Sequence, residues 1–215
     1  MRNFAASTLA FVGGFVLMAL EVIGARYLAK DFGGSFYVWV SQIGVVLIAL
    51  AFGYYVGGTL ADRCQRLSLL SAVLVPSGLL TCLIPNFSNR LITALILRHP
   101  TDHDIPILWQ KLDPVLGSSL VFLLPCFGLA TLSPYLIRLR AQSLAHVGRT
   151  SGLIIAASTV GSIAGVFVSG YVLIDHLNAP DIFRLTGALT VLLGLSCFFM
   201  DGWFAEETGE AAGAE

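Results

Sequence analysis

Charged side chains are scarce in this chain of 215 residues. Only 12% of the residues are Asp, Glu, Lys or Arg, whereas soluble domains carry about a quarter. Hydrophobic residues make up 56%, and several apolar runs are long enough for a membrane crossing. This composition excludes an ordinary soluble domain and indicates an integral membrane protein, with the lipid bilayer as its first partner. The formal net charge of −1 provides no basic face for nucleic acid.

Cysteine is also rare, and its spacing does not suggest chemistry. No two cysteines have the Cys-x-x-Cys or metal-ligand spacing of a redox or zinc site. Three of the four lie in apolar runs, where cysteine acts as a small packing residue. The four are Cys64, Cys82, Cys126 and Cys197.

Motifs for catalysis are missing from the sequence as well. It has no nucleophilic triad, no paired catalytic carboxylates and no Gly-rich nucleotide loop after a strand. One loop does collect metal-ligand types, namely His99, Asp102, His103 and Asp104. Because no further ligands are identifiable, a solvated loop is favoured over a metal site. We therefore expect a chain that is not itself an enzyme and that has no metal or cofactor.

Six apolar segments are long enough to cross a bilayer at about 20 residues per crossing. Backbone polar groups in lipid need internal partners, so each segment is expected to be a helix. The first segment lacks a small-x-small cleavage site and is interpreted as a retained span rather than a signal peptide. Within a membrane domain of residues 1–204, the expected helices cover residues 4–28, 37–60, 67–87, 115–139, 151–174 and 182–204. The sequence thus predicts an all-α integral membrane protein with six transmembrane helices.

Two segments fall outside these spans. Residues 88–114 form the one long connection, and its first part, "SNRLITALILRHP", has the apolar face of a short helix lying in the membrane interface. Residues 205–215 are acidic and rich in small side chains, so we expect them to form a disordered tail.

The positions of lysine and arginine bear on orientation, because cytoplasmic loops are enriched in them. With the N-terminus inside, the basic residues divide equally between the two sides. The inner connections are compact and contain one carboxylate, Asp62, whereas the long outer connection also holds Asp102, Asp104 and Asp113. We therefore expect both termini to be cytoplasmic, in a protein of the cell's inner (plasma) membrane.

The stretch "GGTLADRCQR" at residues 57–66 concentrates charge at the end of the second span. Small residues recur at four-residue spacing there, at Ala49, Gly53 and Gly57. Such spacing lets a neighbouring helix approach closely. The chain is expected to turn at Gly58 and bring Asp62 to the inner face, where its carboxylate can accept N–H groups of the next helix and pair with an arginine of the fourth span. The basic residues of this group are Arg63, Arg66, Arg138 and Arg140.

Glu21 is the only carboxylate well inside a predicted span. On a helical projection it shares one stripe with Ala10, Gly14, Leu17, Gly24 and Leu28, which places it on a packing face rather than toward lipid. An ionisable group at this depth is costly, and it marks a candidate site for a cation or a proton. The alternative is a structural glutamate tied to Arg26, Gln42 or a backbone group. The residues leave both interpretations open.

The charged turn resembles the loop between the second and third helices of major facilitator transporters, where Gly-x-Leu-Ala-Asp-Arg precedes further basic residues. The matching residues are Gly58, Leu60, Ala61, Asp62, Arg63 and Arg66, while Gln65 and Leu67 depart from the pattern. By this resemblance, the six helices are expected to correspond to half of a major facilitator fold.

A longer resemblance is more specific. The stretch "GFVLMALEVIGARYLAKDFGGSFYVWVSQIGVVLIALAFGYYVGGTLADR" is similar to the opening of the membrane region of fused spermidine synthase-like proteins, which carry a glutamate in helix 1, an arginine soon after it, an FG-x-S turn and an LADR exit. These elements correspond to Glu21, Arg26, Phe32, Gly33, Ser35 and residues 60–63. "LSPYLIRL" at 132–139 and "STVGSIAGVFVSGYVLI" at 158–174 resemble later parts of that family, so the likeness covers about residues 10–200.

The resemblance implies a function without implying catalysis. In the fused proteins a soluble aminopropyltransferase-like domain follows the membrane region, whereas this sequence stops about eleven residues after the sixth span. We therefore expect a membrane scaffold or partner subunit of a spermidine synthase-like system, working with a soluble aminopropyltransferase-like chain or other membrane subunits. The alternative is a small-solute transporter completed as a homodimer, for which Glu21 favours a cationic substrate such as a polyamine. A third and weaker interpretation is an enzyme subunit whose catalytic chain is separate.

Overall fold

The computed structural model describes residues 2–34, 36–99, 105–140 and 147–202, and these are helical apart from short turns. No strand occurs among them. The helices are α1 (Arg2–Phe32), α2 (Phe36–Arg63), α3 (Ser68–Leu97), α4 (Ile107–Ala130), α5 (Leu132–Arg140), α6 (Val147–Val168), α7 (Ile174–His176) and α8 (Ala179–Phe199), with a π-helical segment, η2 (Ser169–Leu173), between α6 and α7.

Six stretches are long and apolar enough to cross a membrane, as the sequence predicts. α4 and α5 together form the fourth span, Ile107–Arg140, while α6, η2 and α7 form the fifth, Val147–His176. The protein is therefore an all-α, multi-pass membrane protein. The tail predicted at residues 205–215 lies outside the described residues.

We call the end of the bundle that holds the α1–α2 and α3–α4 connections the outer end, and the opposite end the inner end.

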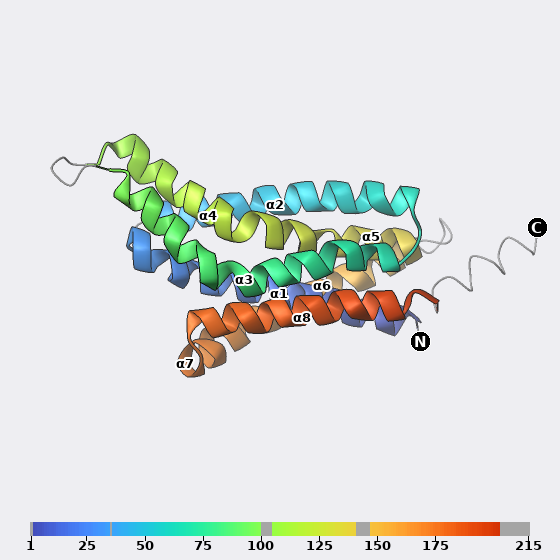
Figure 1. Ribbon diagram of the computed structural model, residues 1–215. Coiled ribbons are helices and arrows are strands. Elements are labelled where there is room, and N and C mark those ends of the chain that lie inside the picture. Colours follow the sequence, from blue (N-terminus) through green and yellow to red (C-terminus); the bar gives the residue numbers. More distant parts are fainter. Residues whose placement is uncertain (1, 35, 100–104, 141–146, 203–215) are drawn as a thin grey trace, which may run out of the picture.

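The prediction of a separate interfacial helix within residues 88–114 is wrong, because α3 continues unbroken to Leu97 and α4 already begins at Ile107. Pro85 is accommodated inside α3, and nothing after it stops the helix. The 30 residues of α3 measure about 45 Å, which exceeds a hydrocarbon core of roughly 30 Å. The outer turns of α3 and α4 accordingly extend past the other helices (Figure 1).

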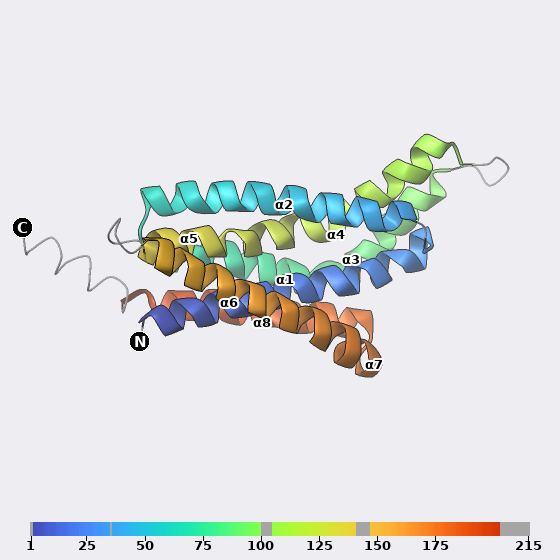
Figure 2. The same ribbon diagram turned by 180° about the vertical axis from the view of Figure 1, so that it is seen from behind.

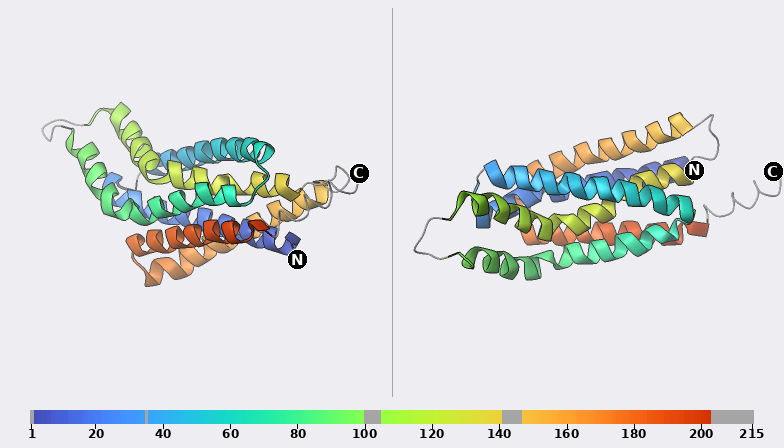
Figure 3. Two further views of the ribbon diagram at one scale, coloured as in Figure 1. Left: turned by 45° about the vertical axis from the view of Figure 1, so that its right-hand side comes forward. Right: turned by 90° about the horizontal axis from the view of Figure 1, so that it is seen from above.

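The six spans pack as three close pairs. α1 lies along α6, α2 along α4, and α3 along α8, as Figures 1 and 3 show from different sides. In terms of the six spans, these are the pairs 1–5, 2–4 and 3–6. If spans 1, 2 and 3 are exchanged with spans 4, 5 and 6, respectively, pair 1–5 becomes pair 4–2 and pair 3–6 stays the same. Because equivalent spans cross in opposite directions, this packing has the form of an inverted three-helix repeat, which many transporter folds share.

Glycines bring the paired backbones into direct contact. A Cβ on Gly161 of α6 would collide with the carbonyl oxygen of Phe11 on α1, and the glycine four residues later lies equally close to the same helix. Gly57 of α2 lies against the backbone of Thr131, and the glycine four residues earlier meets the end of α4. The prediction that small residues on the second span admit a neighbouring helix is confirmed. In lipid, close packing of this kind is a main source of helix association.

Candidate functional site

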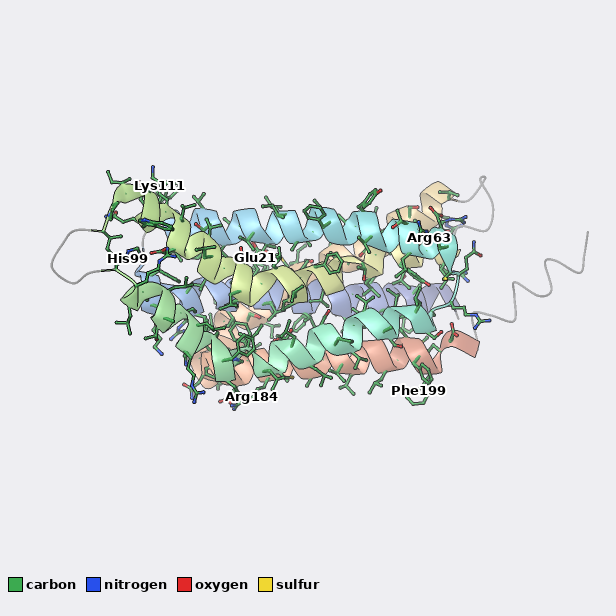
Figure 4. The ribbon with its side chains drawn as sticks, turned by 45° about the horizontal axis from the view of Figure 1, so that its top comes forward. Glu21, Arg63, His99, Lys111, Arg184 and Phe199 are labelled. Carbon is green, nitrogen blue, oxygen red and sulfur yellow. The ribbon has the colours of Figure 1, made fainter. Side chains whose placement is uncertain are left out.

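Glu21 lies on α1 between the two ends of the bundle (Figure 4). The glycines of its stripe show which way it faces, since Gly14 lies against Ser158 of α6 and Gly24 against Phe122 of α4. At 100° per residue, Glu21 points between these two directions. α4 and α6 do not pack closely against each other, and Figure 2 shows α6 diverging from α2 toward the outer end with α1 between them. Glu21 is therefore partly exposed.

Among the described residues, no side chain or backbone group is bonded to the carboxylate of Glu21. The buried amide of Gln42 on α2 donates its Nε2 hydrogen to the backbone carbonyl of Glu21 at 2.5 Å, so it does not reach the carboxylate. Arg26 is exposed near the outer end and borders a small cavity with Asp175 and His176. The structure thus brings Gln42 to Glu21 but leaves Arg26 apart. The tie that a structural glutamate needs is missing from this part of the chain.

The helix beside Glu21 is the least covered of the six spans. Of the apolar stretch that would cross the membrane, 17% is buried in the fifth span, against 33–61% in the other five. One side of α6 packs on α1 through Gly161 and Gly165. The other side exposes small residues, including Gly152, Ala156 and Thr159, together with larger aliphatic side chains. Because Gly161 and Gly165 meet Phe11 and Phe15, Glu21 lies about six residues, or roughly 9 Å, further toward the outer end, level with η2. The seam at Glu21 and the exposed Tyr171 of η2 at the same level form the candidate site.

The inner end carries the predicted pair between Asp62 and Arg138. Arg138 Nε donates to Asp62 Oδ1 at 2.5 Å, and the two side chains are 44% and 63% exposed, respectively. A pair this exposed adds only about 0–1 kcal/mol. The prediction that the chain turns at Gly58 is wrong, because α2 remains helical to Arg63 and the chain turns over the next four residues.

Among the described residues, neither Arg63 nor Arg66 forms an ion pair with Asp62. Arg63 and Arg66 are exposed, and Arg140 has an interaction of its own. Gly58 has open space where a Cβ would project, so the position does not require glycine. It is Gly57, one residue earlier, that the packing requires.

Two residues that the sequence analysis missed hold the inner turn in place. The hydroxyl of the fully buried Tyr135 lies 2.5 Å from the carbonyl oxygens of both Cys64 and Arg66, which share its single hydrogen. Asp201, just after α8, accepts the backbone N–H of Ser68 at 3.0 Å, which is the role expected of Asp62. No sequence signal marks either residue, because both act on backbone groups far away in the chain.

A buried charged group joins the outer ends of α3 and α4. The carboxylate of Asp113, only 8% exposed, accepts a hydrogen bond from the Arg98 guanidinium and lies 2.7 Å from His99 Nε2. The same guanidinium stacks 4.1 Å above the ring of Trp109. Of the metal-ligand types noted in this loop, residues 102–104 lie outside the described ranges. Within those ranges, no group of three or more His, Cys, Asp or Glu residues is arranged to hold a metal.

Comparisons with known proteins add no assignment to this geometry. No family model matches the chain, and no curated protein or solved structure matches it either. The site is therefore interpreted from its residues and packing. An unpaired carboxylate inside a membrane span, beside an uncovered helix face, can hold a proton, bind a cation or receive a hydrogen-bond donor from another chain.

Proposed function

We propose that this protein is a membrane subunit that works within a larger assembly, as a scaffold or partner subunit of a spermidine synthase-like system. The observation that supports an assembly is the unpaired, partly exposed carboxylate of Glu21. A charged group at the centre of a membrane helix costs roughly 2.5–3.5 kcal/mol on insertion scales, and such groups normally face protein or water rather than lipid. A second chain over the seam between α6 and α2 would supply what the lipid lacks.

The resemblance described above supports the kind of assembly. It points to a soluble aminopropyltransferase-like chain as the catalytic partner, bound to this membrane module directly or through other membrane subunits. The distribution of basic residues described above supports a plasma-membrane location with both termini in the cytoplasm. On this orientation, the exposed Arg63 and Arg66 of the inner turn lie on the cytoplasmic side, in agreement with the positive-inside rule.

A second candidate is a small-solute transporter that forms from two copies of the chain. It is favoured by the inverted three-helix repeat of the packing, because transporters place their substrate site near the bilayer midplane between such repeats. Six helices provide one wall of such a site, and Glu21 on that wall suits a cationic solute. In this case, the partner across the seam is the same protein.

The experiment is site-specific photo-crosslinking in native membranes. A photoreactive residue at Tyr171, which is 71% exposed on η2 at the level of Glu21, is compared with one at Leu192, which is 59% exposed on α8. We expect a defined protein adduct from position 171 and only lipid adducts from position 192. An adduct containing a subunit of an aminopropyltransferase complex supports the scaffold role, and an adduct with a second copy supports the transporter. Equal yields of protein adduct at the two positions would contradict an assembly through this face.

Orientation is tested separately by cysteine labelling in intact cells. In a variant whose other cysteines are replaced, a cysteine at Gln65 should resist an impermeant thiol reagent until the membrane is opened. Labelling of Gln65→Cys in intact cells would reverse the orientation, because this exposed position lies in the turn between α2 and α3.

A further inference from the structure

A second carboxylate without a partner lies at the outer end, beside a cavity that the proposed function does not use. The cavity has a volume of about 360 Å³, which falls within the range of small-molecule sites. It lies where the end of α1, the start of α2, the end of α3 and the start of α4 meet. Its polar and aromatic lining consists of Asp31, Phe32, Tyr37, His99, Gln110 and Asp113.

The two carboxylates of this cavity differ in how they are neutralised. Asp113 is paired with the guanidinium of Arg98 and with His99. Asp31 has no ion pair among the described residues, and its Oδ2 is shielded from solvent without a hydrogen-bond donor there. A carboxylate oxygen in this condition costs free energy until a donor reaches it. Among the described lining residues, Asp31 is the one carboxylate left unpaired once the Arg98–Asp113 pair is set aside. The ammonium of Lys111 lies over the lining ring of Tyr37, so a bound cation has to displace it from that ring.

The remaining walls suit an organic cation better than a metal ion. The ring of Tyr37 already attracts an ammonium, because the Nζ of Lys111 lies 5.5 Å from its centroid, and Phe32 adds a second aromatic wall. Aromatic faces bind ammonium groups by cation–π attraction. A metal ion requires several convergent ligands, and no suitable group of His, Cys, Asp and Glu occurs in the described part of the chain.

We propose that this outer cavity binds a small organic ammonium ion, with Asp31 as its counter-ion and the rings of Tyr37 and Phe32 as its walls. Glu21 takes no part in this site, so the proposal stands or falls independently of the partner role and of the transporter role.

The test uses the full chain purified in a mild detergent. Thermal unfolding is followed with increasing butylammonium or tetramethylammonium chloride, against sodium chloride at equal ionic strength. A ligand that binds only the folded state raises the unfolding midpoint in a saturable way. We compare the wild-type protein with Asp31→Asn and with the matched control Asp175→Asn, which changes an exposed carboxylate on α7, also toward the outer end.

We expect saturable stabilisation by at least one of the two ammonium ions in the wild type and in Asp175→Asn, with an apparent Kd at least tenfold weaker in Asp31→Asn. If Asp31→Asn does not fold, Tyr37→Leu at an exposed ring replaces it, with an expected weakening of about threefold. The proposal is overturned if both ammonium salts act no differently from sodium chloride. It is also overturned if whichever of these two site variants is measured binds as tightly as the wild type.

Discussion

The two sides of α6 show how differently one helix can be completed. The side that faces α1 contacts it at Gly161 and Gly165, where backbone lies against backbone. Its other side exposes Gly152, Ala156 and Thr159. The first side is covered within the chain, whereas no described residue covers these positions. A row of small residues in the sequence therefore indicates a face suited to helix packing. The structure is needed to show whether the helix packed against that face belongs to the same chain.

The largest expected effect comes from breaking the closed side. In Gly161→Leu, the new side chain collides with the carbonyl oxygen of Phe11, which is backbone and has no rotamer to escape into. We expect a loss of about 3 kcal/mol, at the upper end for overpacked contacts, measured as a lower unfolding midpoint in detergent. The matched control is Gly152→Leu on the open side, where nothing lies within 4 Å of a Cβ. If both variants unfold alike, the two sides do not differ as described.

A smaller effect is expected for the Asp113 group at the outer end, whose partners also lie within the chain. Asp113→Asn removes the charge that neutralises Arg98 and the carboxylate oxygen that lies beside His99 Nε2. Breaking a buried pair by removing one partner costs about 3–5 kcal/mol. Since Arg98 is itself 33% exposed, water compensates part of this, and we expect a loss of about 2 kcal/mol in the same assay. An unchanged midpoint would mean that the group does not join α3 to α4.

The smallest effect is expected for the exposed pair at the inner end. Asp62→Asn should lower the stability by less than about 1 kcal/mol, because Asp62 is 63% exposed. In a double-mutant cycle, the coupling with Arg138→Gln should be within that limit and should fall in high salt. Coupling of 2 kcal/mol or more would show that the pair is shielded, for example by a partner at this end.

The sequence was sufficient for the fold class and for the number of spans, because apolar length and backbone satisfaction in lipid leave only helices. It was also sufficient for a pair between Asp62 and an arginine of the fourth span, since charges at the inner end of one span meet those of another, but it left Arg138 and Arg140 open as the partner. It misplaced the ends of α3 and α4, because hydropathy marks where a helix leaves the lipid, and the helix itself continues further. For the same reason, the sequence analysis placed Asp113 in a loop, whereas it lies within α4.

Other features depend on contacts that no local pattern records. Gly57 and Gly58 are neighbours of the same type, yet only Gly57 meets another backbone. Tyr135 and Asp201 act on backbone groups of the α2–α3 turn from α5 and from the end of α8. Glu21 was recognised as unusual from its depth, but the missing bond to Arg26 or Gln42 became visible only once α1, α2 and α4 were placed together.

The central proposal is that Glu21, which has no bonded partner in the described part of the chain, meets a partner protein in the membrane. Glu21→Gln tests it directly when the same variant is measured in two states. In the isolated chain, the unfolding midpoint should stay unchanged or rise, because the described residues make no bond to the carboxylate. In native membranes, the photo-crosslink from position 171 should weaken at least severalfold, because the partner loses the charge that it meets. A Glu21→Gln chain that is destabilised in isolation as much as Asp113→Asn, while its crosslink persists, would contradict the account.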